Sequence, residues 1–124
     1  MRIEADGTGN VTVKGHEFQF SGSDLSVTSN SGTITFRDNI GELIGGAATL
    51  SIDSTSGNVT VRDNAMIIGT STGANVDIDS GSGNLTVKNN SFTSPIRDAE
   101  SDGRCTLKGN SPTFTGLGNC PASG

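Results

Sequence analysis

The chain has 124 residues, of which 31% are hydrophobic, and it contains neither Trp nor Tyr. This length suits one domain, but the apolar content is too low for a thick globular core and suits a narrow stack of short strands. The net charge of −5 argues against a nucleic-acid partner, and no apolar run approaches the roughly 20 residues of a membrane span.

One short sequence motif occurs five times along the chain. It reads Gly-Asn-Val-Thr-Val-Lys in residues 9–14 and has counterparts in residues 32–37, 57–62, 83–88 and 103–108. The starts lie 23, 25, 26 and 20 residues apart. Such a period is typical of a solenoid, in which each repeat forms one coil and only stacking buries a core. We therefore predict a single domain, 1–124, with coils that start near residues 9, 32, 57, 83 and 103.

Within each repeat, apolar residues alternate with Thr and then with a basic residue, which predicts a strand with opposite faces. The expected inward residues are Val11, Val13, Ile34, Phe36, Val59, Val61, Leu85, Val87, Cys105 and Leu107. Stacking then builds an outward column of Thr12, Thr35, Thr60, Thr86 and Thr106. Beside it lies a second outward column, the basic column, made of Lys14, Arg37, Arg62, Lys88 and Lys108.

The rest of each repeat predicts two further strands. A column of His16, Asn39, Asn64, Asn90 and Asn110 marks the bend after the first strand, where Asn side chains can hydrogen-bond from coil to coil. A second apolar column follows near Phe18, Ile40, Met66 and Phe92, and a third strand covers residues 25–27, 50–52 and 76–78. We expect an all-β parallel β-helix of about five coils. A right-handed coil is favoured, because the hexapeptide repeat of left-handed solenoids is absent.

The carboxy-terminal end departs from this pattern. Residues 94–102 are expected to form a surface loop in place of the third strand. Residues 109–124 are expected to cap the open end of the solenoid, with Phe114 and Leu117 closing the core. A disulfide between Cys105 and Cys120 would tie this cap to the last coil; the alternative is two reduced cysteines in a cytosolic protein.

Two of the repeats read Val-Thr-Val-Arg-Asp-Asn (residues 59–64) and Leu-Thr-Val-Lys-Asn-Asn (residues 85–90). This pattern resembles the right-handed parallel β-helix repeats of the pectin-lyase-like superfamily, and the resemblance covers residues 3–120. Residues 105–119 resemble the last coil of secreted bacterial β-helix proteins of unassigned function, which often end in Cys, Gly-Asn-x-Pro and Thr-Gly-x-Gly-Asn. The resemblance implies a carboxy terminus outside the cytosol. The enzymes of the superfamily place acidic residues, often with calcium, and a basic catalytic residue on one outer sheet. Those features have no clear counterpart here, so the resemblance implies no catalytic residue.

The compartment is not decided by the amino-terminal residues. Met1-Arg2-Ile3-Glu4 leads directly into the first repeat without a signal pattern. The chain is therefore either intracellular or part of an exported protein whose signal is not included. We expect the second, a secreted or cell-surface protein.

The basic column is the candidate ligand-binding site. It holds five of the eight cationic residues. Like charges so close together repel one another unless anions neutralise them. A linear acidic polymer, such as a uronate glycan or teichoic acid, would match the spacing. The alternative is an ordinary soluble sheet surface, with Asp38 and Asp63 pairing with the adjoining arginines.

Other polar residues carry weaker hypotheses. The Thr column lacks the second Thr column of an ice-binding face. Asp77 and Asp79 alternate, as do Asp98, Glu100 and Asp102, but without the spacing of a calcium loop, so we predict no metal and no cofactor. His16, the single histidine, is interpreted as a variant of the Asn column rather than as a catalytic base.

These observations predict a non-catalytic structural or surface-binding solenoid. One alternative is a filament that assembles through an uncapped amino-terminal end. A polysaccharide lyase or hydrolase is the less expected alternative, because five short coils offer little groove and no Trp or Tyr for sugar stacking.

Overall fold

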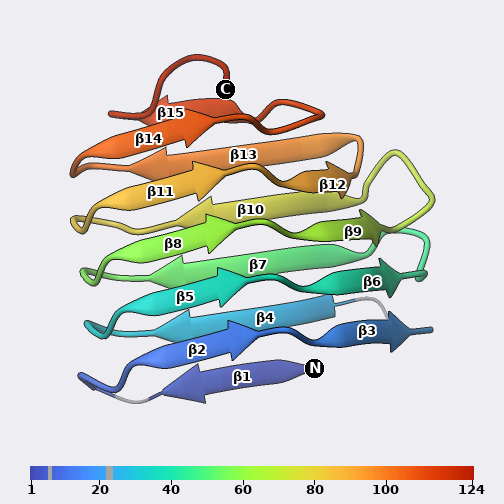
Figure 1. Cartoon of the computed structure of the whole chain (residues 1–124), viewed down its shortest axis with the longest axis horizontal. Helices are drawn as coiled ribbons and strands as arrows, with labels where there is room; N and C mark the ends of the chain where they lie inside the picture. The colour runs from blue at the N-terminus through green and yellow to red at the C-terminus, as the bar shows by residue number, and fades with distance from the viewer. Residues whose placement is uncertain (6, 22–23) are drawn as a thin grey trace.

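The computed structural model describes residues 1–5, 7–21 and 24–124. These residues form fifteen strands and no helix, and every neighbouring pair of strands within the three sheets is parallel. Figure 1 shows the strands climbing through the molecule as a stack of coils. The predicted all-β solenoid is therefore confirmed.

Each sheet collects one strand from successive coils. Sheet A comprises β1 (Arg2–Ala5), β4 (Asp24–Ser29), β7 (Thr49–Ser54), β10 (Asn75–Asp79), β13 (Ile96–Ser101) and β15 (Thr115–Gly118). Sheet B comprises β2 (Val11–Lys14), β5 (Ile34–Arg37), β8 (Val59–Arg62), β11 (Leu85–Lys88) and β14 (Cys105–Lys108). Sheet C comprises β3 (Glu17–Phe20), β6 (Ile40–Leu43), β9 (Ala65–Ile68) and β12 (Ser91–Thr93).

The chain passes from sheet B to sheet C and returns through sheet A before it enters the next coil. Four coils contain all three strands; β1 precedes them, and the last coil has only β14 and β15. In Figure 1 sheets B and C cross the front from left to right and sheet A returns behind them, which makes the coil right-handed. Sheet B packs against the inner face of sheet A, through pairs such as β2 with β4 and β5 with β7.

The core follows the predicted alternation. Sheet B stacks Val11 under Ile34, Val59, Leu85 and Cys105, each one coil apart, and of these only Cys105 is more than slightly exposed. Sheet A stacks Leu25, Leu50 and Val76 in the same way, and all three are fully buried. Like residues lie over like because parallel strands of equal register bring equivalent positions together.

The second apolar column differs from the prediction at one position. Phe18, Met66 and Phe92 are buried as expected, but Ile40 is 51% exposed. The register of sheet C aligns Gly41 with Phe18 and Met66, so Ile40 belongs to the outward set. A glycine is required there, because its φ is +127° and a Cβ would overlap the Phe18 carbonyl oxygen of the coil below.

Residues 94–102 are not a surface loop. Residues 96–101 form β13, which pairs in register with β10 and carries the buried Ala99 above Ile78. The prediction failed because Arg97 occupies the inward column that Leu25, Leu50 and Val76 fill in earlier coils. Its guanidinium donates hydrogen bonds to the carbonyl oxygens of Ser94 and Thr113, so this last inward position ties β13 to the cap.

The cap covers the carboxy-terminal end as predicted, with one correction. Phe114 is buried and its ring meets that of Phe92 edge to face, with centroids 6.1 Å apart. Leu117 instead aligns with the outward Glu100 and is 45% exposed. The chain then folds back so that Phe114 and Gly124 exchange two backbone hydrogen bonds, and a disulfide joins Cys105 to Cys120.

Candidate functional site

The basic column forms one straight line on the outer face of sheet B. The strand register pairs Lys14 with Arg37, Arg37 with Arg62, Arg62 with Lys88, and Lys88 with Lys108. Each of these residues ends its strand and alternates with a buried apolar residue, so its side chain points away from the core. Adjacent members therefore lie about 4.8 Å apart along the solenoid axis.

The residue after each basic position determines how much of the positive charge is compensated. This position is left-handed in every coil and is occupied by Gly15, Asp38, Asp63, Asn89 and Gly109, with φ between 54° and 70°. Where it is Asp, the carboxylate turns back onto the preceding arginine: Arg37 Nη1 lies 3.0 Å from Asp38 Oδ2, and Arg62 Nη1 lies 2.7 Å from Asp63 Oδ2. These pairs are partly exposed, so each stabilises the fold only slightly.

The three lysines are different. Lys14, Lys88 and Lys108 form no ion pair with any residue that the structure describes. Their left-handed neighbours are Gly or Asn, which carry no charge. The column therefore has two compensated arginines in its second and third coils and uncompensated lysines in the first, fourth and fifth.

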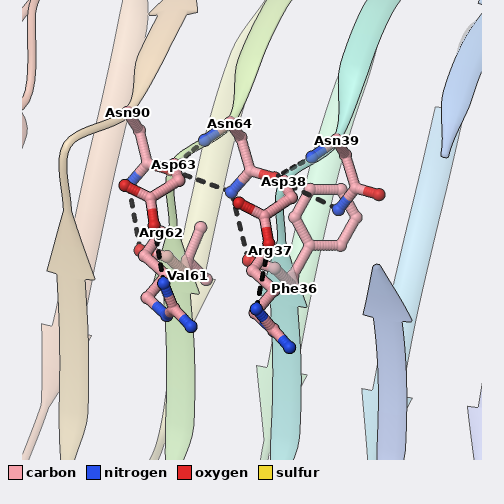
Figure 2. A network of polar contacts seen from close by, with 9 residues as sticks. All are labelled: Phe36, Arg37, Asp38, Asn39, Val61, Arg62, Asp63, Asn64 and Asn90. Carbon is pink, nitrogen blue, oxygen red and sulfur yellow. Dashed lines mark hydrogen bonds and ion pairs between the residues drawn. The ribbon is translucent and has the colours of Figure 1, made fainter. Parts of the chain in front are cut away.

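A buried ladder of asparagine side chains holds the ends of these strands in place (Figure 2). Asn64 shows the pattern: its Nδ2 donates to Phe36 O at 3.1 Å and to Asn90 Oδ1 at 2.8 Å. Its Oδ1 accepts from the backbone N–H of Asn39 at 3.0 Å and from Asn39 Nδ2 at 3.1 Å. Asn39, Asn90 and Asn110 repeat most of these bonds, and all four residues are buried.

The ladder confirms the bend predicted for the Asn column, with one refinement. The left-handed residue is the one before each Asn, and the Asn itself supplies the coil-to-coil hydrogen bonds. His16 occupies this position in the first coil, where its backbone N–H donates to Asn39 Oδ1 at 2.9 Å. Its imidazole is exposed, with its centroid 5.9 Å from that of Phe18.

A second buried ladder, of serines, was not recognised in the sequence. Ser54 Oγ donates to Gly32 O of the coil below at 3.0 Å and accepts the N–H of Gly57 at 3.0 Å. Ser29 bonds in the same way to Gly9 and Gly32, and Ser101 to Gly83 and Gly103. The signal was present, since a serine precedes the first glycine of the next repeat by two or three residues. This ladder fixes the turn from sheet A to sheet B.

Five of the acidic residues gather on the outer face of sheet A. Asp77 pairs with Asp98 in register, and Asp79 lies between Asp53 and Glu100. Burial raises the pKa of Asp77, and the nearby carboxylates of Asp79, Asp98 and Asp53 raise it further. Burial also raises the pKa of Asp53, with a smaller contribution from Asp79. Asp102 follows β13 in the turn and lies outside these columns.

The described residues contain no group of three or more His, Cys, Asp or Glu side chains that is arranged to hold a metal ion. Two open depressions lie away from the basic column. One of about 360 Å³ is bordered by Glu4, Thr28 and Asp53, and one of about 310 Å³ by Thr70, Pro95 and Pro112. Neither includes a residue of the basic column.

Within the described part of the chain there is no helix with the length and hydropathy needed to cross a membrane. Comparison with known proteins returned no matching family model, curated protein or solved structure.

Proposed function

We propose that this protein is a non-catalytic surface-binding solenoid that binds a linear anionic polymer, such as a uronate glycan, along the basic column. The observation that carries the proposal is the register of Lys14, Arg37, Arg62, Lys88 and Lys108 on the outer face of sheet B. Five cations at one repeat of about 4.8 Å meet a polymer whose negative charges recur at a similar distance.

The rigidity of the platform supports this function. The Asn ladder fixes the end of each strand of sheet B through buried hydrogen bonds. Binding then costs little ordering of the protein backbone, because the cations are already aligned before a ligand arrives. The lysines contribute most, since Asp38 and Asp63 compensate the two arginines.

The disulfide supports a location outside the cytosol. Cys105 and Cys120 are joined in the structure, and such bonds persist in oxidising compartments. Anionic glycans and teichoic acids are polymers of the cell surface and its surroundings. A secreted or cell-surface protein would therefore meet the proposed ligand.

The test is retention on an immobilised polyuronate at several salt concentrations. Lys14→Ser/Lys88→Ser/Lys108→Ser is expected to elute at clearly lower salt than the unmodified protein, because three uncompensated charges are gone. Arg37→Ser/Arg62→Ser is expected to have a smaller effect. Asp38→Asn/Asp63→Asn is expected to elute at higher salt, since Asn tolerates a left-handed backbone while freeing both arginines.

A matched pair of substitutions distinguishes the effect of the basic column from the effect of net charge. Lys88→Ser and Arg2→Ser each remove one cation, but Arg2 lies on β1 and pairs with Glu4 at 2.9 Å. The first substitution should weaken retention and the second should leave it almost unchanged. Equal effects of both substitutions, or elution of all variants at the same salt, would contradict the proposal.

A further inference from the structure

The outer face of sheet A carries a compact patch of carboxylates, which we call the acidic face. It comprises Asp53 on β7, Asp77 and Asp79 on β10, and Asp98 and Glu100 on β13. The register places these five residues on three adjacent strands in two neighbouring columns. None of them forms an ion pair with a described residue.

The carboxylates of the acidic face repel one another, and no ion pair with a described residue offsets this repulsion. The raised pKa values of Asp53 and Asp77 follow first from burial and then from the neighbouring carboxylates. Like charges opposite one another on adjacent strands destabilise a sheet unless a cation answers them. A surface that supplied cations at the strand spacing would relieve this cost.

The same molecule presents such a surface on its other side. Sheet B packs against the inner face of sheet A, so the outer faces of the two sheets point in opposite directions (Figure 1). Every complete coil contributes one strand to each sheet, and the two faces therefore repeat at the same distance along the axis. Arg37, Arg62 and Lys88 lie in the same three coils as the acidic face.

We propose that the acidic face on sheet A of one molecule docks against the basic column on sheet B of a second copy. With two solenoids side by side and their coils level, Lys88 faces the strands that carry the five carboxylates, together with Arg37 and Arg62, which are each paired with an Asp of their own chain. No axial shift is needed, because the same repeat sets both spacings. The contact joins unlike faces, so the docked pair retains one free acidic face and one free basic column, and the association is open-ended.

This route differs from stacking of the ends. The cap closes the carboxy-terminal end, where residues 114–124 fold back over the last coil and Phe114 fills the core. An end-to-end filament would need that end to be open. The charged faces are unobstructed by the cap, because the acidic face ends at β13, one strand below β15.

The mass of the protein across a dilution series, measured by sedimentation equilibrium, tests the contact. In about 10 mM salt, where charges act over roughly 30 Å, the average mass is expected to rise with concentration. In about 1 M salt, where screening shortens this range to roughly 3 Å, the monomer mass is expected. A monomer at every concentration in low salt would overturn the proposal.

A mixing experiment distinguishes unlike-face docking from other association. Asp77→Asn/Asp98→Asn removes charge from the acidic face, and Arg62→Ser/Lys88→Ser removes it from the basic column. Each variant alone is expected to stay monomeric in low salt, whereas an equal mixture is expected to form pairs. Association of either variant alone, or no pairs in the mixture, would contradict the proposed contact.

Two controls complete the design. Glu17→Gln/Glu42→Gln removes two carboxylates from sheet C and is expected to associate like the unmodified protein. The acidic-face variant retains the whole basic column and should still be retained on polyuronate. Loss of self-association without loss of polyuronate retention thus separates this inference from the proposed function, which does not depend on it.

Discussion

The ring of Phe36 stacks on the ring of Phe18 from the coil below, with centroids 6.2 Å apart and planes 8° apart. Gly41, in the same coil as Phe36, aligns with Phe18 and contributes no side chain to the core. Phe36 is also the one aromatic residue in a column otherwise made of Val13, Val61, Val87 and Leu107. A large side chain in one sheet thus accompanies a missing one in the next.

From this relationship we expect Phe36 to tolerate a loss of side-chain volume poorly and Gly41 to tolerate a gain of volume poorly. Phe36→Ala should lower the free energy of unfolding by about 3–5 kcal/mol, because it leaves a cavity beside a glycine that cannot fill it. Phe36→Leu should cost less, since it preserves more of the volume. Urea unfolding followed by circular dichroism measures both, and an equally small effect of the two substitutions would contradict the packing described.

Gly41→Ala should destabilise the protein by about 2 kcal/mol or more, because the new Cβ would overlap the Phe18 carbonyl oxygen and the backbone is left-handed. Gly46→Ala is the matched control. A Cβ there would lie 3.9 Å from Ser71 Cβ, so its effect should remain within about 0.5 kcal/mol. Thermal or urea unfolding of the two variants should therefore give clearly different midpoints.

We expect the free energy of unfolding to depend strongly on the buried side-chain amides of the Asn ladder. Asn64→Ala would leave Phe36 O without its side-chain donor and Asn39 N–H without its acceptor. We expect a loss of about 2–4 kcal/mol, because both groups are buried away from water. Asn58→Ala removes one exposed hydrogen bond to Asn84 N–H and should cost about 1 kcal/mol or less. Similar losses at both sites would argue against a structural role for the ladder.

The acidic face predicts that stability rises as the pH falls. Because the pKa values of Asp53 and Asp77 are raised in the folded state, that state binds more protons than the unfolded chain above the ordinary Asp pKa. Near neutral pH both carboxylates are charged, so the folded state carries the full cost of holding these charges. Protonation removes this cost as the pH falls through the raised pKa values of the two groups. Asp77→Asn should therefore stabilise the protein at pH 7, and this gain should shrink toward pH 4. Urea unfolding of both proteins across this range tests the slope.

The disulfide predicts a local effect on the cap. Cys105→Ser/Cys120→Ser should lower the free energy of unfolding by about 3 kcal/mol, because the 15-residue separation between the cysteines is no longer closed in the unfolded chain. Hydrogen exchange should speed up first at β15 and at Phe114. The unmodified protein in reductant should behave like the variant; a large difference between them would show that the serines disturb the cap themselves.

Local repetition made most of this fold predictable. The five repeats identify the strands of sheet B, their inward residues and the basic column, because equal spacing in a parallel stack brings equal positions together. The errors occurred where one residue carried the wrong polarity for its position. Ile40 is apolar but faces out, whereas Arg97 is charged but occupies an inward column and bonds to the cap.

Sequence by itself determined the period, the alternation within each strand and the line of five cations, since these depend only on which residues recur at which interval. The sequence offered the pairing of Asp38 and Asp63 with the adjoining arginines only as an alternative, and the tertiary structure shows both pairs, formed through a left-handed backbone at each Asp. It also decided that acidic residues from β7, β10 and β13 meet on one face opposite the basic column. Distances across a sheet depend on register, and register is set by packing of the whole stack.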